Sequence, residues 1–280
     1  MVTRKLNKHG LKTDKSTYVI AEIGINHGGD LDMAKRLIDS AARSGVDAVK
    51  FQTYLTEKRA PKNNKEIFDI LKKCELPFDA FIELKEHSDN LGVEFFSTAF
   101  DEESVDFLND LGCDIFKIAS FDVTNHKLLR KVAKTKKSVI LSVGMSNMEE
   151  ITEAYKILKE SAANVILLHC ISAYPTREED ANLGAIQTLK HKFDCVVGQS
   201  DHTNDIFVPL CAVAAGAQVI EKHFKINKQM ECVDSPVSIT EEQTREMVLQ
   251  IRRIENAFGS GIVAPTPPQK PAEGFRRFSK

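Results

Sequence analysis

Ionisable and hydroxyl side chains recur inside or directly after short apolar runs of this 280-residue chain. Lys50 and Lys117 lie in two of these runs. Hydroxyl side chains lie in or at the end of four runs: Thr98, Ser120, Ser142 and Ser200. A charged side chain in an apolar run is costly unless it is paired or has a function. Two cations with several hydroxyl donors are well suited to a small phosphate or carboxylate. The pattern predicts an anion site, and lysines paired with interior carboxylates are the alternative.

Two histidines, His202 and His223, end consecutive apolar runs, GQSDH and VIEKH. If these runs form neighbouring strands, both imidazoles can point to one spot. Two histidines completed by water and substrate oxygens suit a divalent ion such as Mn²⁺, Mg²⁺ or Zn²⁺. We therefore expect a metal site at His202 and His223, and two structural hydrogen-bonding histidines are the alternative.

Glu22 is the one carboxylate well inside an apolar run, VIAEIGI. Burial near a metal or a phosphate can tune the pKa of such a group for proton transfer. Asp201 and Glu221 compete for this role, but both lie beside a histidine in the sequence. The alternation of side chains along a strand is expected to point them away from the histidines' side.

Eight apolar runs alternate with amphipathic stretches that repeat apolar residues at helical spacing, such as residues 31–45. The runs cover residues 18–25, 48–54, 93–100, 114–120, 138–144, 164–170, 195–200 and 218–224. Nearly continuous apolar runs are typical of parallel strands covered on both faces. The alternation predicts an α/β fold, a (β/α)8 TIM barrel, whose site lies at the carboxyl ends of the strands. A doubly wound sheet is the alternative, but the glycine-rich phosphate loop that it normally carries is absent.

Composition excludes several classes of protein. With 38 basic and 40 acidic residues, a net charge of -2 and no tryptophan, a charge-driven nucleic-acid or membrane-surface protein is not expected. The sequence has no apolar run of bilayer length and no secretory signal, and its six cysteines form no metal-binding pair. We expect a cytoplasmic protein with an N-terminal extension (1–17), a barrel (18–259) and a proline-rich tail or linker remnant (260–280).

Seven motifs occur in an order that is specific to one family. They are AEIGINHGGDLDMAKRLIDSAARSGVDAVKFQTY, FFSTAFD, FKIAS, LSVGMS, the YP after the sixth run, GQSDHT and EKHF. Over residues 18–259 the chain resembles the N-acetylneuraminate (sialic acid) synthase family. The resemblance implies a transferase of sialic-acid-like (nonulosonic acid) biosynthesis. It would condense phosphoenolpyruvate with an N-acylated hexosamine aldehyde, N-acetylmannosamine or a 2,4-diamino sugar, and release phosphate.

The resemblance also implies residue roles. His202 and His223 match the family's metal ligands, with Mn²⁺ favoured and Mg²⁺ or Co²⁺ as alternatives, and the metal would polarise the sugar aldehyde. Glu22 matches the catalytic acid or base, and phosphoenolpyruvate contacts match Lys50, Thr98, Lys117, Ser120, Ser142 and Ser200. Gln52, Tyr174 and Asp234 match positions that touch the sugar. Ser172 occupies the position of the family's asparagine before Tyr-Pro. Serine is polar but shorter, so one contact with phosphoenolpyruvate is expected to differ from the family's.

The chain departs from the family after the eighth run. MECVDSPVSIT lacks the family's Gly-Pro. These 280 residues do not include the family's small antifreeze-like domain, which supplies an arginine to the partner subunit's sugar, so we expect either a naturally short member or a chain that has been cut. Arg276 and Arg277 are candidate substitutes for that arginine, with a flexible polar tail as the alternative. A homodimer is expected. The competing functions are a phosphoenolpyruvate-dependent aldol condensation on another sugar and a non-catalytic barrel that binds an anion.

Overall fold

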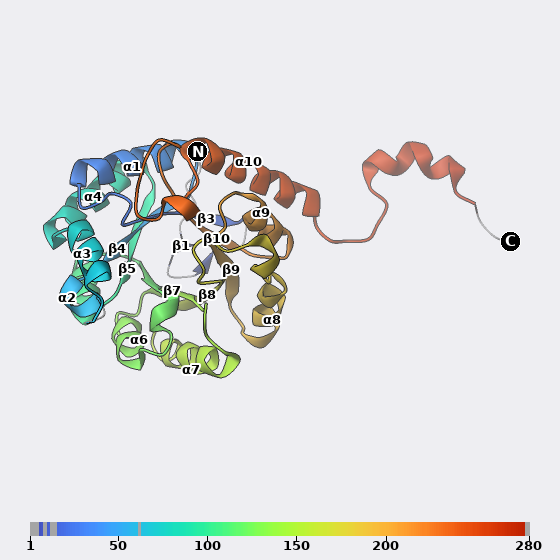
Figure 1. The fold of residues 1–280 in the computed structure, drawn as a ribbon. Coiled ribbons are helices and arrows are strands. Elements are labelled where there is room, and N and C mark those ends of the chain that lie inside the picture. Colours follow the sequence, from blue (N-terminus) through green and yellow to red (C-terminus); the bar gives the residue numbers. More distant parts are fainter. Residues whose placement is uncertain (1–5, 8–9, 12–15, 61–62, 278–280) are drawn as a thin grey trace.

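Eight parallel strands close into a barrel surrounded by helices (Figure 1). The computed structural model describes residues 6–7, 10–11, 16–60 and 63–277. The barrel strands are paired in chain order, and β10 closes onto β3: β3 (Tyr18–Gly24), β4 (Ala48–Thr53), β5 (Glu94–Ala99), β6 (Ile115–Ile118), β7 (Ser138–Ser142), β8 (Asn164–Cys170), β9 (Val196–Asp201) and β10 (Val219–His223). The predicted TIM barrel is confirmed, and each of its strands falls on one of the eight apolar runs.

Side-chain alternation divides the strands into two faces. One apolar cluster fills the amino-terminal part of the barrel interior and includes Tyr18, Ile20, Ala48 and Phe96. A larger cluster lies between the strands and the helices. Because inward side chains recur every second residue, the strand that points Ile20 inward also points Glu22 inward. The interior is therefore apolar in its lower layers and polar at the carboxyl ends of the strands.

Most of the helices that cover the barrel begin at a polar cap, and each helix buries one face. Asp30, Asp101, Asn125 and Asn147 cap their helices through side-chain oxygens that accept backbone N–H groups, which is the usual role of Asp and Asn at this position. The helices are α1 (Leu31–Ser44), α4 (Phe78–Leu91), α5 (Glu102–Asp110), α6 (His126–Ala133), α7 (Met148–Lys159), α8 (Gly184–Lys192), α9 (Phe207–Ala214) and α10 (Glu241–Phe258).

The segment that follows the second barrel strand differs from its prediction. We expect a long loop over residues 55–78, but the structure has two helices there, α2 (Thr56–Arg59) and α3 (Lys65–Cys74). Asn64 caps α3 through its side chain, which accepts the backbone N–H of Ile67 at 3.1 Å. This segment lies beside the carboxyl ends of β4 and β5, so its residues can reach the site.

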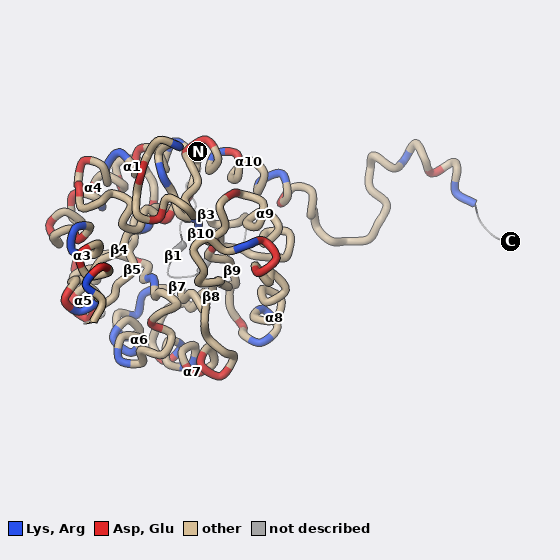
Figure 2. Tube along the Cα trace, in the orientation of Figure 1, with Lys and Arg blue, Asp and Glu red and all other residues tan. Residues whose placement is uncertain are grey.

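The segments before and after the barrel are described to different extents. Most of the predicted N-terminal extension lies outside the described residues, apart from the short pair β1 (Leu6–Asn7) and β2 (Gly10–Leu11). Beyond α10, the 3-10 helix η4 (Pro267–Phe275) lies apart from the barrel (Figure 1). Acidic and basic residues are interspersed on the outer helices (Figure 2). No helix in the described part of the chain is long and apolar enough to cross a membrane.

Candidate active site

A pocket opens at the carboxyl ends of the barrel strands, and every predicted site residue lines it. They are Glu22, Lys50, Gln52, Thr98, Lys117, Ser120, Ser142, Ser172, Tyr174, Ser200, His202, His223 and Asp234. These residues are far apart in the sequence and come from all eight strands or the loops that follow them. The pocket also contains residues that the sequence does not predict as part of the site, among them Arg59, Cys170 and Glu221.

The floor of the pocket holds the two lysines. Nζ of Lys50 donates to Oγ1 of Thr98 at 2.9 Å, and Nζ of Lys117 donates to Oγ of Ser142 at 2.7 Å. Both lysines are almost fully buried, and burial lowers the pKa of Lys117 although Glu221 opposes the effect. Two buried ammonium groups beside hydroxyl groups are the arrangement that the sequence predicts, and such an arrangement suits a small anion.

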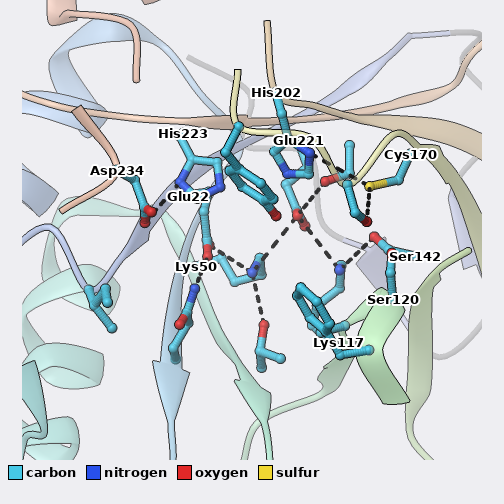
Figure 3. Close-up of a pocket in the computed structure, with 18 of the residues that line it drawn as sticks. Glu22, Lys50, Lys117, Ser120, Ser142, Cys170, His202, Glu221, His223 and Asp234 are labelled. Carbon is cyan, nitrogen blue, oxygen red and sulfur yellow. Dashed lines mark hydrogen bonds and ion pairs between the residues drawn. The ribbon is translucent and has the colours of Figure 1, made fainter. Parts of the chain in front are cut away.

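The lysines also contact interior carboxylates, which is the alternative that the sequence left open. Nζ of Lys50 lies 2.7 Å from Oε2 of Glu22, and Nζ of Lys117 lies 3.6 Å from Oε1 of Glu221. Figure 3 shows the Glu221 carboxylate between the two lysines. The carboxylates compensate the charge of the lysines, so the ion pairs and an anion site are compatible in one pocket.

Glu22 and Glu221 differ in electrostatic character. Burial raises the pKa of Glu22 against the attraction of Lys50, and repulsion from Glu221 adds to the rise. Burial also acts to raise the pKa of Glu221, but Lys117, Lys50 and the hydroxyl of Ser200 outweigh it and hold that pKa well below its usual range. Two nearby carboxyls whose pKa values are pushed apart can take separate roles, one holding a proton and one remaining charged.

The expected orientation of the two competing carboxylates is right for Asp201 and wrong for Glu221. Asp201 points to the outside of the barrel, where its Oδ2 lies 2.6 Å from Nζ of Lys222. Glu221 lies two residues before His223, not next to it, so both side chains share the inward face of β10. The structure accordingly places Glu221 in the pocket.

The two histidines face the same part of the pocket, with ring centroids 5.5 Å apart. The Nδ1–H of His202 donates to the carbonyl oxygen of Ile171 at 2.7 Å, which leaves Nε2 as the lone-pair nitrogen. Burial, aided by repulsion from His223, lowers the pKa of His202 to about 4, so this imidazole is neutral at pH 7. Nδ1 of His223 lies 3.3 Å from Oδ2 of Asp234 but makes no hydrogen bond within the described residues.

A two-histidine metal site fits this arrangement. His202, a neutral imidazole held by a hydrogen bond through one nitrogen, offers the other nitrogen to a metal. Burial acts to lower the pKa of His223, but the Asp234 carboxylate outweighs it and raises that pKa, so a metal would compete with a proton for this imidazole. The described residues hold no group of three or more histidine, cysteine or acidic side chains placed to bind a metal. The protein would therefore supply His202 and His223, and water or substrate oxygens would complete the coordination.

The remaining predicted residues surround Glu22 and the histidines. Nε2 of Gln52 donates to Oε1 of Glu22 at 3.1 Å. The ring of Tyr174 packs against that of His202 with centroids 4.1 Å apart. Oγ of Ser172 lies 3.9 Å from Sγ of Cys170. Arg276 and Arg277 do not line this pocket, so the structure does not show them as a cover for the site.

The backbone near Glu22 is shaped by a glycine. Gly24 has a φ of +56°, and a Cβ at this position would lie 3.1 Å from Oε1 of Glu22 and 3.2 Å from Nε2 of Gln52. The register between β3 and β4 shifts between Glu22 and Gly24. Glycine allows this left-handed turn and keeps space free between Glu22, Gln52 and Asp234.

Comparison with known proteins decides the family. The family model described as "NeuB family" matches residues 37–263. The chain belongs to the NeuB family. The resemblance predicted from its motifs is confirmed.

Several NeuB-family relatives are similar over most of their length. An N,N'-diacetyllegionaminic acid synthase of Campylobacter jejuni is 44% identical over 89% of this chain and 79% of its own. The N-acetylneuraminate-9-phosphate synthase of Mus musculus is 34% identical over 91% of this chain and 74% of its own. A crystal structure of the N-acetylneuraminic acid synthetase of Leptospira borgpetersenii in complex with citrate aligns with a TM-score of 0.90 and 40% identity, covering 93% of this chain and 91% of that one.

Glu221 and Arg59 line the pocket of this NeuB-family chain, but only Glu221 has a signal in the sequence that could have placed it there. The two-residue spacing between Glu221 and His223 is a signal that places both on one face of a strand. Arg59 lies in the segment after β4, where no strand period applies, and its direction depends on the conformation of α2.

Proposed function

We propose that this NeuB-family enzyme condenses phosphoenolpyruvate with the open-chain aldehyde of an N-acylated hexosamine. The product is a nine-carbon 2-keto acid of the sialic acid type, and inorganic phosphate is released. The observation that carries the proposal is one pocket that holds a two-lysine cradle, a buried carboxyl of raised pKa and two converging histidines. The names of the relatives, synthases of legionaminic acid and of N-acetylneuraminate 9-phosphate, support it.

The cradle binds the phosphate and carboxylate of phosphoenolpyruvate. Lys50 and Lys117 supply charge, and hydroxyls supply hydrogen bonds from neighbouring strands: Thr98, Ser120, Ser142 and Ser200. These groups are already held in place before the ligand binds, since Lys50 bonds to Thr98, Lys117 to Ser142, and the backbone N–H of Gly144 donates to Ser120 at 3.0 Å. Preorganised donors reduce the cost of fixing the ligand.

Glu22 transfers protons during the condensation. The enol carbon of phosphoenolpyruvate bonds to the aldehyde carbon, water adds to the resulting cationic carbon, and phosphate leaves by cleavage of its C–O bond. The attacking water loses both of its protons: the aldehyde oxygen gains one, and the other leaves with the phosphate as the ketone forms. A carboxyl whose pKa is raised by burial can hold and return a proton near neutral pH, and Glu22 is such a group.

His202 and His223 hold a divalent metal, for which Mn²⁺ is the proposed ion and Mg²⁺ or Co²⁺ the alternatives. When bound, the metal supplies Lewis-acid polarisation of the aldehyde oxygen. The ring of Tyr174 and the side chain of Asp234 keep the two imidazoles in place. Gln52, Tyr174 and Asp234 line the part of the pocket assigned to the sugar, and Ser172 lines the part assigned to phosphoenolpyruvate.

The proposed setting is the cytoplasm, and the proposed assembly is a homodimer of this chain. The six cysteines form no disulfide with one another, as is usual in a reducing compartment. The oligomeric state is measured directly by sedimentation velocity.

A panel of acceptor sugars tests the proposed function. Purified protein with phosphoenolpyruvate and Mn²⁺ is offered N-acetylmannosamine, its 6-phosphate, a 2,4-diacetamido sugar and mannose, which is not N-acylated, and phosphate release and product mass are followed. We expect stoichiometric phosphate and a nine-carbon acid with at least one sugar. Turnover only with sugars that are not N-acylated would favour condensation on another aldehyde. Tight phosphoenolpyruvate binding without turnover on any sugar would favour a non-catalytic anion-binding barrel.

A further inference from the structure

Arg59, the last residue of α2, is held against two aromatic rings beside the pocket. Its guanidinium carbon lies 4.4 Å from the ring centre of Tyr54 and 3.8 Å from that of Phe100. The two rings themselves pack edge to face, with centroids 6.3 Å apart. The hydroxyl of Tyr54 donates to the carbonyl oxygen of Leu71 at 2.9 Å, which fixes this ring against α3. The guanidinium is therefore positioned by packing.

The hydrogen-bonding capacity of Arg59 is not used up by the protein. Its Nη1 atom is buried and has no hydrogen-bond partner among the described residues. Asp234, Glu22 and Asp122 attract it electrostatically, while burial is the main influence on its pKa and lowers it. Leaving a donor of a charged group buried and unsatisfied is costly. The guanidinium of Arg59 therefore has an N–H donor available to a ligand.

The place of Arg59 in the pocket distinguishes it from the cradle. Lys50 and Lys117 contact Glu22 and Glu221 at the floor, near the hydroxyls of the neighbouring strands. Arg59 comes from the segment after β4 and lines the pocket with Gln52 and Asp234. The phosphate and carboxylate of phosphoenolpyruvate already have two cations at the floor, so Arg59, which lines the same pocket, is available to the second substrate.

We infer that Arg59 is a specificity-determining residue of the acceptor sugar, donating hydrogen bonds to an oxygen of one of its substituents. The planar donor edge of a guanidinium suits either the carbonyl oxygen of an acylamino group or a phosphoryl oxygen. This inference rests on the proposed function and names the chemical group that selects the acceptor.

Kinetics of substituted enzymes test the role of Arg59. Arg59→Met removes the donors and keeps an apolar stem on the two rings, and Arg59→Lys keeps the charge without the planar edge. Lys58→Met is the matched control, because Lys58 is the exposed neighbour on α2 and pairs with Glu103 outside the pocket. In Arg59→Met we expect the KM of the acceptor sugar to rise roughly 10- to 100-fold, as for a lost charged hydrogen bond. The KM of phosphoenolpyruvate should stay within twofold.

Pairs of sugars identify the substituent. N-acetylmannosamine is compared with mannose, which lacks the acylamino group, and with N-acetylmannosamine 6-phosphate. A penalty in Arg59→Met that disappears with mannose assigns the contact to the acyl carbonyl, and an added penalty with the 6-phosphate assigns it to the phosphoryl group. An equal penalty on all three sugars, or a rise in the KM of phosphoenolpyruvate instead, would overturn the inference.

Direct binding keeps this test separate from that of the proposed function. Calorimetric titration of the same sugars into the metal-free protein with phosphoenolpyruvate bound measures affinity without turnover. Weaker sugar binding by both Arg59→Met and Arg59→Lys, with Lys58→Met unchanged, supports the inference even if the wild-type protein proves inactive. Equal affinities in an active enzyme would overturn the inference and leave the proposed function intact. If Arg59→Met does not melt cooperatively, Arg59→Lys decides alone.

Discussion

Glu22 and Glu221 approach the same buried ammonium group, Nζ of Lys50, at 2.7 and 3.9 Å, yet their pKa values are shifted in opposite directions. The difference arises because Glu221 also faces Lys117 and accepts a hydrogen bond from Ser200 at 3.0 Å, whereas Glu22 also feels the negative charge of Glu221. A proton that enters this cluster is therefore held by Glu22, while Glu221 stays ionised to balance the two lysines.

Replacement of Glu22 by glutamine separates proton transfer from binding. Glutamine has the same shape but cannot exchange a proton, so we expect kcat to fall roughly 100- to 10,000-fold. The affinity for phosphoenolpyruvate, measured by calorimetry, should change little, because the cradle of lysines and hydroxyls remains. A kcat within a few-fold of wild type would show that another group transfers the proton. Glu83→Gln, at an exposed residue that pairs with Lys35, is the control for a surface carboxylate.

Removal of a metal-site histidine should remove the metal as well as the activity. We expect His223→Ala to lose bound Mn²⁺, as measured by elemental analysis after dialysis, and turnover to fall to background because the aldehyde is no longer polarised. A chelator should have the same effect on the wild-type protein, reversed by added Mn²⁺. His87→Gln, which changes a histidine paired with Asp39 far from the pocket, should keep both metal and activity. Full turnover in the presence of chelator would contradict the metal assignment.

A methyl group added at Gly24 tests the space reserved near Glu22. Gly24→Ala combines a left-handed backbone, costing about 1–2 kcal/mol of stability for a non-glycine residue, with a Cβ close to Glu22 and Gln52. We expect lower stability in urea and a higher KM for the acceptor sugar. Gly28→Ala is the matched control, since Gly28 also has a positive φ, +62°, but a Cβ there meets nothing within 4 Å. It should lose similar stability and keep its KM. Equal KM values in both variants would contradict the assignment of this space to the sugar.

The barrel and most of its pocket are predictable because the alternation of side chains along each strand determines which residues point into the interior. In a closed parallel barrel, the parity that sends Ile20 or Ile140 into the interior also sends Glu22 or Ser142 there, one layer nearer the carboxyl ends. Polar residues at the ends of apolar runs therefore indicate where the site lies. The same parity places Glu221 with His223, and the prediction that it points away is wrong because the two residues are two positions apart rather than adjacent.

Arg59 shows what the sequence does not contain. Its contacts depend on where α2 and α3 lie. The sequence of this segment has no strand periodicity, and α2 has no side-chain cap that would mark its start. No local pattern says that Arg59 stacks on Tyr54 and Phe100, which lie at the ends of different strands. Only the closed barrel brings the three side chains together.

A buried histidine outside the metal pair makes folding sensitive to acid. His27 is 4% exposed, its Nδ1 accepts the backbone N–H of Gly29 at 3.1 Å, and its Nε2 has no hydrogen-bond partner in the described part of the chain. Burial lowers its pKa from 6.5 to about 4. Between these two pH values the unfolded chain binds a proton that the folded chain does not, so stability present above pH 6.5 is lost as the pH falls toward 4.

Replacement of His27 should make the acid side of the stability profile shallower. The lowered pKa corresponds to a loss of about 3 kcal/mol over this window, at about 1.4 kcal/mol for each unit of pKa. In His27→Asn the side-chain oxygen can still accept from Gly29 but does not titrate. We expect its free energy of unfolding, measured by urea denaturation from pH 7 to pH 4.5, to fall less steeply than that of wild type. His126→Gln, at a histidine that pairs with Glu153 on the surface, should keep the wild-type slope. A parallel profile in His27→Asn would contradict the lowered pKa of His27, because only an equal pKa in the folded and unfolded states leaves the slope unchanged.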